Sequence, residues 1–554
     1  MIKILFDKGK YMKKQFLKKV NRFQKILSVF LILLVLNPIY TKVQARTNIL
    51  EEAKGVLKNN YVNTVSDYVL SATDLNEMMN RLNDPYSDYF TKEEYSEFVD
   101  SINNTFYGIG VGIDIVPQGV RVTKVFENSP AFEAELKPGD IIVQANNNNL
   151  AGLSAEAATK YIKGEAGSYV NIVVHRGAEI LNFNVQRREI KVATVTSEMQ
   201  PGKVAYISIS SFGEETSDLF SVELKKMDGL GANSYIIDLR NNGGGYMYTA
   251  LDIAGHFIGG VPAIIIEDRT LVKYKEKAIA HEKIIDKPVI FLINQYSASA
   301  SEILAAAVKD YDKATFIGTT TYGKGVAQQM FSLSDGSFLK LTVEKFYSPH
   351  GKLIHKTGVS PDFEMMYAEV DSMKVANLLL SSTSLPKDKR GFMRIDMDGK
   401  EFYVDLKMAR SEEYWNEYNY ILSQNLSYNA YRGTYLGWES ISKADIGNKI
   451  LQRFSNYKVL DDLKKDIETD KHFKINFKGT IDYDSIKTQG IELIDETSGK
   501  RTPVKLSIDN NTVLVTPMEQ LEKGQAYYLV INDGVKDTNG KSIKQGAVIR
   551  YIVP

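Results

Sequence analysis

Three serines occupy alternate positions where a buried strand is expected to turn into a helix, in the run FLINQYSASASEILAAA. They are Ser297, Ser299 and Ser301. A serine at such a turn lies beside helical N–H groups without acceptors and beside the positive end of the helix dipole, which favours an oxyanion. Any of the three could be a nucleophile for acyl transfer. The alternative is that small residues let the helix pack on the sheet, with a serine as N-cap. Glu302, one helical turn after Ser299, is placed either to orient this turn or to cap the helix.

A lysine between two glycines, Lys324 in TTTYGKG, is the second candidate for chemistry. Lysine titrates near ~10.4 in water, and burial lowers this value by up to about 3–5 units. A neutral amine next to a serine hydroxyl can accept its proton, which is the Ser-Lys form of nucleophilic catalysis. The alternative is a solvated lysine in a surface loop.

Composition limits the other chemistry available to the chain. The 554 residues include 68 basic and 68 acidic side chains, no cysteine and six histidines. A balanced charge favours neither nucleic acid nor an anionic membrane as partner. The absence of cysteine excludes thiolate catalysis, disulfides and cysteine-ligated metals, and no histidine spacing predicts a metal site.

The serine turn and the lysine lie in a segment, residues 191–365, that is expected to form an α/β core. Continuous β-branched strands alternate there with helices, as in a buried sheet covered on its faces. Residues 46–104 have helical spacing, with Thr91 and Glu94 as a capping box. We interpret this region as a lid or dimerisation arm without a catalytic role. Residues 366–468 are predicted to be a mixed α/β connection to which we assign no function.

The N-terminus, residues 1–45, is predicted to be a signal peptide. Basic residues precede the apolar run Ile26–Leu36, and Pro38 and the small-residue ending VQA follow. Such a run is too short to span the hydrocarbon core of a bilayer, so cleavage after Ala45 is favoured over an uncleaved membrane anchor. We therefore expect an exported protein, extracellular or in the cell envelope.

Residues 105–190 are predicted to be a small β domain with one helix. The loop YGIGVGI leaves backbone N–H groups free to hold a carboxylate, and the strand after it has an edge that can accept a peptide. With FENSPAFEAELKPGDIIVQANN and SAEAATKYIKGEAGS, this region resembles a PDZ domain. Residues 469–554 have short strands punctuated by Gly and Asn, typical of a β-sandwich, and resemble a bacterial Ig-like domain.

Residues 80–365 as a whole resemble the tail-specific, carboxy-terminal processing proteases. The resemblance rests on LNDPYSDYF, GIGVGI, LKPGDII, IIDLRNNGGG, SASASEI, GTTTYGKGVAQQ and FYSPHGKLIHKTGVSPD, in the family's order. It implies a multidomain α/β and β protein: a helical N-terminal arm, a PDZ domain, a crotonase/Clp-protease-like α/β core and the C-terminal Ig-like β-sandwich.

The resemblance also assigns roles to individual residues of the core. It implies that Ser299 is the nucleophile, Lys324 the general base and Gln328 the residue that orients the lysine. The expected oxyanion hole consists of the N–H of Ala300 and one from the glycine run, for which we choose Gly244. Gln328 can contact Lys324 across four residues in a helix but not in an extended strand.

In the PDZ domain the resemblance implies that Gly108, Ile109, Gly110 and Val111 bind the peptide carboxylate. Arg176 is either a relay to the protease core or an ordinary exposed strand arginine.

The function implied is that of an exported serine endopeptidase that cleaves near protein C-termini and is gated by peptide binding to the PDZ domain. It needs no metal or cofactor, its partners are protein or peptide C-termini, and relatives suggest a homodimer. The C-terminal domain is expected to contact an adaptor or the cell wall. The alternative is a catalytically silent PDZ and Ig-like scaffold or a cell-wall-binding protein.

Overall fold

The computed structural model describes residues 49–554 apart from 366–369, 398, 424–428, 442–448, 461–465 and 488–489. The predicted signal peptide lies outside the described residues. Of the helices in the described part of the chain, none is long and apolar enough to cross a membrane.

The N-terminal region is helical, as predicted, and contains one short strand. Its elements are α2 (Ile49–Asn60), α3 (Asp67–Leu70), α4 (Leu75–Leu82), β1 (Asp88–Phe90) and α5 (Lys92–Ile102). The capping box of α5 is confirmed, because the Thr91 hydroxyl accepts from the Glu94 N–H at 3.2 Å while the Glu94 carboxylate accepts from the Thr91 N–H at 2.8 Å. Both orphan N–H groups at the start of this helix are therefore satisfied.

The region from residue 105 to 191 is a small β domain around its own apolar core. Strand β2 (Thr105–Gly108) pairs with β9 (Arg188–Lys191), and the main sheet has the order β3-β4-β5-β7-β8, with β6 paired to β5. The elements of this sheet and its helices are β3 (Val111–Val116), β4 (Gly119–Val125), α6 (Pro130–Glu133), β5 (Ile141–Ala145), β6 (Asn148–Asn149), α7 (Ala155–Ile162), β7 (Tyr169–Arg176) and β8 (Glu179–Gln186). Because β3 is the terminal strand of this sheet, one of its edges has no partner strand.

The α/β core is built on a six-stranded sheet of order β10-β11-β12-β15-β16-β19. All neighbours in it are parallel except β10 and β11. Its strands are β10 (Val195–Gln200), β11 (Val204–Ile209), β12 (Ser234–Asp238), β15 (Val289–Ile293), β16 (Thr315–Gly318) and β19 (Phe363–Glu364). β12 and β15 are buried along their whole length. The unbroken apolar sequence of β15 predicts this, and β12 has an apolar centre between Ser234 and Asp238.

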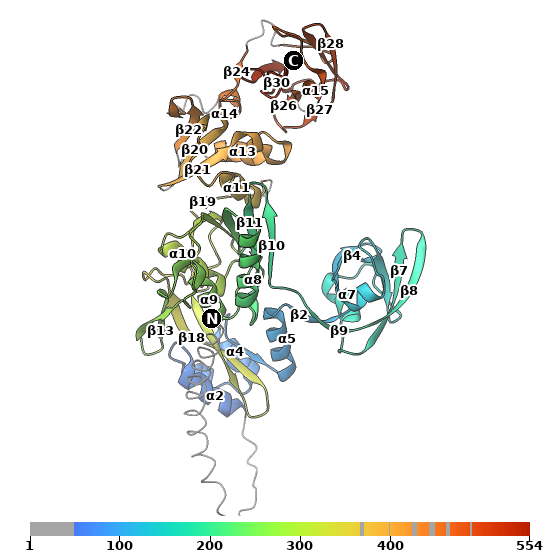
Figure 1. The fold of residues 1–554 in the computed structure, drawn as a ribbon. Coiled ribbons are helices and arrows are strands. Elements are labelled where there is room, and N and C mark those ends of the chain that lie inside the picture. Colours follow the sequence, from blue (N-terminus) through green and yellow to red (C-terminus); the bar gives the residue numbers. More distant parts are fainter. Residues whose placement is uncertain are drawn as a thin grey trace, which may run out of the picture. The chain divides into compact units, whose positions relative to one another are not determined.

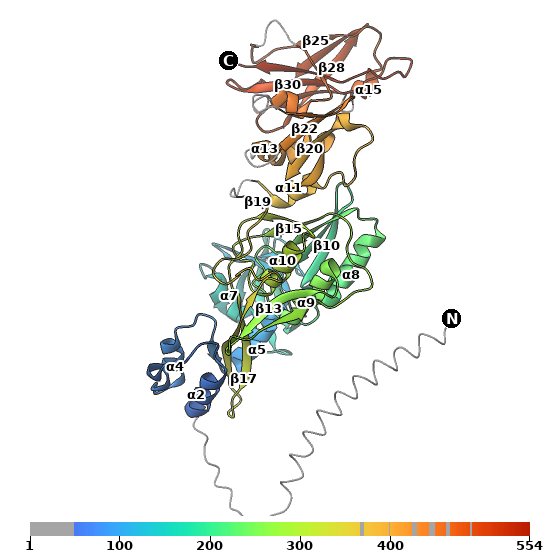
Figure 2. The ribbon, with the colours of Figure 1, turned by 90° about the vertical axis from the view of Figure 1, so that its left-hand side faces the viewer.

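One face of this sheet packs against three helices, α8 (Thr216–Gly229), α9 (Met247–Ile258) and α10 (Ala300–Asp310) (Figure 1). The other face packs against the segment that follows the core, beginning with α11 (Ser372–Leu379). Figure 2 shows the same arrangement from the side, with α11 and α10 on opposite sides of β15. The connecting region thus completes the hydrophobic core of the six-stranded sheet, because without it this face of parallel strands would be exposed to water.

A second sheet of the core is antiparallel and has the order β1-β18-β13-β14, with β17 on the other edge of β18. Its remaining strands are β13 (Pro262–Asp268), β14 (Lys273–Lys277), β17 (Val326–Ser332) and β18 (Phe338–Tyr347). Strand β1 pairs with the first residues of β18, so the N-terminal region extends the sheet that also contains Gln328.

The connecting region also has a four-stranded sheet of order β21-β20-β22-β23. Its described elements after α11 are η2 (Lys389–Gly391), β20 (Phe392–Met397), β21 (Lys400–Asp405), α12 (Leu406–Ala409), η3 (Glu412–Tyr414), α13 (Trp415–Ser423), β22 (Asn429–Thr434), β23 (Gly437–Ser440), α14 (Lys449–Arg453) and β24 (Lys458–Val459).

The C-terminal domain is the predicted β-sandwich, with sheets of order β24-β31-β30-β26-β27 and β25-β29-β28 around a shared apolar core. Its elements are β25 (Phe473–Asn476), α15 (Tyr483–Lys487), β26 (Ile491–Asp495), β27 (Arg501–Thr502), β28 (Val504–Asp509), β29 (Thr512–Pro517), β30 (Ala526–Ile531) and β31 (Ala547–Ile552). The predicted fold class, an α/β core with two β domains and a helical N-terminal region, is confirmed.

Candidate active site

The three candidate serines have different environments, and only one of them is accessible. Ser297 and Ser301 are fully buried. The Ser297 hydroxyl donates to the Leu239 carbonyl at 2.8 Å, and the Ser301 hydroxyl donates to the Asn242 carbonyl at 2.9 Å. Both therefore hold the serine turn against the loop that follows β12. Ser299 is half-buried and precedes α10 directly, so the structure leaves it as the serine that a substrate can reach.

The backbone of Ser299 is in an unusual conformation, with φ +57° and ψ −113°. A non-glycine residue with positive φ is sterically disfavoured, and such strain is concentrated at functional sites. The N–H of the next residue, Ala300, has no acceptor in the described part of the structure. A free N–H directly after a candidate nucleophile, at a helix N-terminus, is suited to hold an oxyanion.

The glycine run comes into contact with this turn. A Cβ atom on Gly244 would lie 2.8 Å from Ser299 Cβ and 2.9 Å from the Ala300 nitrogen, so only glycine fits. The Gly244 N–H, however, donates to Asn242 Oδ1 at 2.9 Å. The Gly244 N–H would have to leave Asn242 to take part in the predicted oxyanion hole. The N–H groups of the neighbouring Gly243 and Gly245 have no acceptor among the described residues.

The carboxylate of Glu302 connects the serine turn to the lysine loop. Its Oε2 accepts from the N–H groups of Ser299 at 2.9 Å and Lys324 at 2.8 Å. Its Oε1 accepts from the Thr321 hydroxyl at 2.6 Å and from the Gly323 N–H at 2.7 Å. Because two N–H groups share one oxygen, the backbone nitrogens of Ser299 and Lys324 are held within two hydrogen-bond lengths of each other. Glu302 caps the helix and orients both loops, so the two predicted alternatives occur together.

Glu302 is fully buried. Burial raises the pKa of its carboxyl group, and the bonds from Thr321, Gly323, Ser299 and Lys324 oppose that rise. All four neighbours are donors, and only the ionised carboxylate can accept from all of them. The charge is thus stabilised by hydrogen bonds in place of an ion pair.

The side chain of Lys324 is half-buried. Burial and, to a smaller extent, the nearby charge of Lys340 lower the pKa of Lys324 to about 8, while Glu302 and Asp84 oppose the change. The neutral amine that a base requires is therefore accessible near neutral pH. Among the described residues, no hydrogen bond joins the Lys324 amine to the Ser299 hydroxyl. Contacts of this kind are often long without substrate and shorten in the complex.

Among the described residues, no hydrogen bond joins Gln328 to Lys324. It lies in β17, after a bulge at Ala327, and its amide is 3.4 Å from both the Val326 carbonyl and the Thr342 hydroxyl. The backbone is extended here, so the distance between backbone positions four residues apart is longer than in a helix. The role of Gln328 in orienting Lys324 stays a prediction.

The N-terminal region, for which we expected no catalytic role, contributes a residue to this site. The ring centroid of Tyr86 lies 5.3 Å from Lys324 Nζ. The signal in the sequence was the turn NDPYS, a Pro-containing turn within a helical region, but nothing in the sequence indicated that it contacts the lysine loop.

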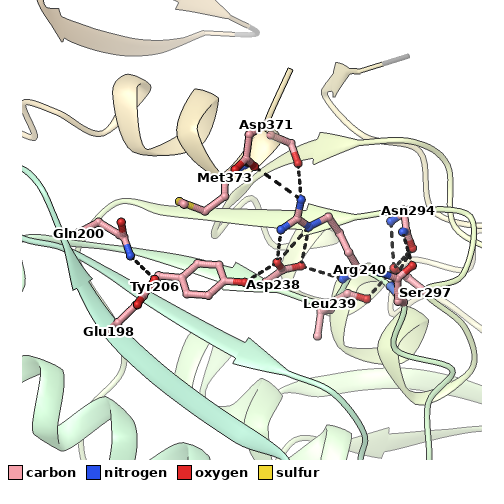
Figure 3. Close-up of polar contacts among 12 residues, drawn as sticks. Glu198, Gln200, Tyr206, Asp238, Leu239, Arg240, Asn294, Ser297, Asp371 and Met373 are labelled. Carbon is pink, nitrogen blue, oxygen red and sulfur yellow. Dashed lines mark hydrogen bonds and ion pairs between the residues drawn. The ribbon is translucent and has the colours of Figure 1, made fainter. Parts of the chain in front are cut away.

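An ionic contact braces the loop between β12 and the glycine run (Figure 3). Arg240 Nε donates to Asp238 Oδ1 at 3.0 Å, and Arg240 Nη1 donates to the Ser372 hydroxyl at 2.8 Å at the start of α11. The Tyr206 hydroxyl donates to Asp238 at 2.7 Å. Burial and the Asp238 carboxylate raise the pKa of Tyr206 to about 12, so it stays a donor. The connecting region therefore helps to hold the loop that leads to the glycines.

The predicted carboxylate-binding loop is ordered by bonds to its carbonyl groups. The Ile109 carbonyl accepts from the Ala131 N–H at 2.8 Å, and the Gly110 carbonyl accepts from the Phe126 N–H at 3.1 Å. The N–H groups of Ile109 and Gly110 have no acceptor within the described residues. Val111 begins the terminal strand β3 and Gly108 ends β2. The loop therefore presents free donors beside an open strand edge, as a peptide carboxylate requires.

Arg176 is not an ordinary exposed strand arginine, and its role as a relay to the protease core stays a prediction. Its guanidinium makes two bonds to Asp140, at 2.7 and 2.8 Å, and a third to the Glu135 carbonyl at 2.9 Å. The Asp140 side chain is 1% exposed. Arg176 is thus an internal brace of the small β domain, because it neutralises a buried carboxylate.

Within the described residues, no group of three or more His, Asp or Glu side chains is placed to hold a metal ion.

Comparison with known proteins agrees with this arrangement. Residues 203–365 match the model of peptidase family S41, residues 107–186 match the PDZ domain, and residues 460–551 match the bacterial Ig-like domain. The chain is 35% identical over 319 residues to carboxy-terminal processing protease CtpB of Bacillus subtilis (strain 168), which covers 56% of this chain and 66% of that protein. It is 33% identical over 336 residues to a probable CtpA-like serine protease of Staphylococcus aureus (strain bovine RF122 / ET3-1). This match covers 60% of this chain and 67% of that protein.

A solved structure, that of the photosystem II D1 C-terminal processing protease, is similar with a TM-score of 0.39 and 24% identity, over 58% of this chain and 93% of that one. The chain spans slightly less than two thirds of the length of the Bacillus relative.

Proposed function

This chain belongs to peptidase family S41, and from that premise we propose that it is an exported serine endopeptidase that cleaves near protein C-termini. Ser299 is the nucleophile and Lys324 the general base. The observation that carries the proposal is the buried Glu302 carboxylate, which accepts from the backbone N–H groups of both residues. It therefore holds the backbone of a strained, half-buried serine close to the backbone of a lysine whose amine has a lowered pKa.

The proposed reaction is acyl transfer in two steps. The Ser299 oxygen attacks the scissile carbonyl carbon while Lys324 Nζ takes the hydroxyl proton. The oxyanion accepts from the Ala300 N–H and from one N–H of the glycine run at 243–245. The carbon–nitrogen bond then breaks as the ammonium group returns the proton to the leaving amine. Water, deprotonated by Lys324, attacks the acyl ester and releases Ser299.

The test uses the full chain and a protein substrate whose C-terminal truncation is followed by mass spectrometry. We expect Ser299→Ala and Lys324→Met to lower kcat by at least about 10³-fold, as removal of a nucleophile or base does elsewhere. Ser360→Ala and Lys313→Met change exposed residues of the same core and serve as matched controls. Cleavage that survives Ser299→Ala would refute the proposal and leave the non-catalytic scaffold as the explanation.

Binding of a peptide C-terminus to residues 108–111 is proposed to regulate cleavage. The free N–H groups of Ile109 and Gly110 and the open edge of β3 support a carboxylate-anchored peptide strand. We expect a peptide ending in a free carboxylate to accelerate cleavage of a separate substrate, whereas the same peptide with an amidated C-terminus has little effect. Equal effects of the two peptides would contradict carboxylate recognition.

Export, a homodimer and contact of the Ig-like domain with an adaptor or the cell wall are parts of the same proposal. The signal-like residues 1–45 support export. N-terminal sequencing of the protein recovered outside the cell should begin at Arg46. Recovery of the intact N-terminus in the membrane fraction would favour the anchored form.

A further inference from the structure

The segment NDPYSDYF crosses from the helical N-terminal region to the edge of the sheet that follows the catalytic lysine loop. Asp84 accepts from the Ser87 hydroxyl at 2.6 Å and from the Tyr86 N–H at 3.1 Å, which closes the turn. The Ser87 oxygen in turn accepts from the N–H of Thr342 in β18 at 3.0 Å. Strand β1 then pairs with β18 in the register Asp88 to Lys340. The turn is therefore fastened to the protease core by backbone and side-chain bonds.

This attachment places an aromatic ring against the amine of the base. The Lys324 Nζ atom is 5.3 Å from the Tyr86 ring centroid. Tyr86 also makes an edge contact with His355, at 6.3 Å between centroids. Burial raises the pKa of Tyr86, and the neighbouring Tyr322, Asp84 and Glu302 raise it further. The ring thus contacts both the amine and the segment at 355, which itself bonds to the lysine loop because the Lys356 N–H donates to the Gly323 carbonyl at 2.7 Å.

The same segment holds a second lysine. Lys340 Nζ lies 4.8 Å from the ring centroid of Phe90 and 5.0 Å from that of Phe98, and the two rings stack at 5.3 Å. Phe90 belongs to β1 and Phe98 to α5. Two aromatic rings restrict where this amine can lie and favour its charged form. Burial lowers the pKa of Lys340, and the charges of Asp88 and Asp84 oppose that change. Lys340 is two residues before Thr342, so both side chains project from the same face of β18.

We propose that residues 84–98 are a positioning element for the general base, in which Tyr86 covers the amine of Lys324 and the rings of Phe90 and Phe98 hold Lys340 as a second cation near it. The inference rests on the proposed role of Lys324 as base. It gives the N-terminal region a part in catalysis that the resemblance to processing proteases did not assign.

The proposal predicts how the protonation of Lys324 responds to each contact. Exclusion of water and a nearby positive charge both disfavour the ammonium form. The charges that oppose them belong to Glu302 and Asp84. Contact with a ring face favours a cation by about 0.5–1 kcal/mol at exposed sites, less than the cost of removing its water. Loss of Tyr86 or of the Lys340 charge should therefore raise the pKa of Lys324 and leave less neutral amine at neutral pH.

The first test compares two changes at Tyr86 in the full chain. Tyr86→Ala removes the ring, and we expect the midpoint of the acid limb of kcat/KM to move up by about one pH unit, which lowers kcat/KM about tenfold at pH 7. Tyr86→Phe keeps the ring and should leave the midpoint within about 0.2 unit of the parent, since the hydroxyl is not what covers the amine.

The second test removes a charge without removing bulk. Lys340→Met should raise the midpoint of the acid limb by about 0.5–1 unit, and Lys340→Arg, which keeps the charge, should restore it. A structural role alone would lower the rate or the thermal midpoint of unfolding in these variants without moving the pH profile. If Tyr86→Ala fails to fold, the pair at Lys340 decides the question.

The outcomes separate this inference from the proposed function. Unmoved midpoints in Tyr86→Ala and Lys340→Met, in enzyme whose activity still requires Ser299, would overturn the positioning role and leave the protease assignment intact. Cleavage that does not require Ser299 would overturn the protease assignment itself. An upward movement of the midpoint with both variants, and its return with Tyr86→Phe and Lys340→Arg, supports the proposal.

Discussion

Replacement of Glu302 by glutamine tests the connection between nucleophile and base most directly. The carboxylate accepts four hydrogen bonds, two at each oxygen, from Ser299, Thr321, Gly323 and Lys324. An amide of the same shape has one accepting oxygen and one donating NH₂ group. Whichever position the nitrogen takes, two donors lose their acceptor and face another donor.

The expected loss of stability follows from these bonds. Hydrogen bonds to a charged group contribute roughly 1.5–3 kcal/mol each, so two of them amount to about 3–6 kcal/mol. The neutral amide avoids the cost of burying a charge, which places the expected net loss in unfolding free energy at the lower end, about 3 kcal/mol. That is a large share of the ~5–15 kcal/mol that stabilises a typical domain.

Glu302→Gln should make Lys324 a more available base and at the same time impair the positioning of the serine and lysine loops. The charge of Glu302 raises the pKa of Lys324, so its removal should move the acid limb of kcat/KM from near pH 8 to lower pH. At the same time kcat should fall by about 10²-fold or more, because the serine and lysine loops lose their common acceptor. A more available base combined with a slower enzyme is the signature of lost positioning.

The assay combines denaturant unfolding with a pH profile of peptide cleavage. Glu282→Gln changes an exposed glutamate of the core and is the matched control, with no expected effect on either measurement. A Glu302→Gln variant that loses less than about 1 kcal/mol and keeps its kcat would refute the reasoning. An acid limb that moves to higher pH would contradict the electrostatic part alone.

Further predictions concern the base, the glycine run and the PDZ domain. In the unmodified enzyme, kcat/KM should rise about tenfold per pH unit below pH 8 and level off above it, because only neutral Lys324 accepts a proton. A value of kcat/KM that does not change between pH 6 and 8 would argue against a lysine base. Gly244→Ala should abolish most cleavage, since its Cβ would clash with the backbone turn at Ser299. Gly243→Ala should be nearly neutral, because a Cβ there has no heavy atom within 4 Å. Equal effects of the two changes in a peptide-cleavage assay would contradict the close approach at Gly244. Arg176→Ala should destabilise the PDZ domain by about 1–3 kcal/mol, because the buried carboxylate of Asp140 loses its partner. Hydrogen exchange of residues 105–190 measures this loss. An unchanged exchange rate would contradict a stabilising role of the Arg176–Asp140 pair.

Much of the site could be predicted because it depends on local pattern. A buried strand, a run of small residues and a helix placed Ser299 at a helix N-terminus, and glycines marked the two loops that approach other backbone closely. The short motifs of residues 80–365, taken in their order along the chain, were enough to indicate the family. Together with the strand pattern of residues 469–554, they also indicated the succession of PDZ domain, α/β core and Ig-like domain. These features are encoded within short stretches of chain, so they can be read without coordinates.

Other features depend on which segments meet in space. The segment SASAS contains three serines. In the part of the chain that the structure describes, Ser297 and Ser301 are buried and bond to the loop after β12, whereas Ser299 does not, and the sequence did not reveal this difference. Gln328 lies in a bulged strand and bonds to Val326 and Thr342 among the described residues, so its predicted contact with Lys324 stays a prediction. The Gly244 N–H already has an acceptor in Asn242. In each case the spacing in sequence allowed several contacts, and the backbone conformation selected one.

The sequence by itself determined the identity of the reactive groups, their order and the elements that hold them, because periodicity, turn residues and motif spacing are local properties. The tertiary structure decided how those groups are tuned. It joined Glu302 to two loops, packed the connecting region against the catalytic sheet and placed the turn at Tyr86 beside the lysine. Burial and electrostatic environment arise from residues distant in the chain, so no local pattern contains them.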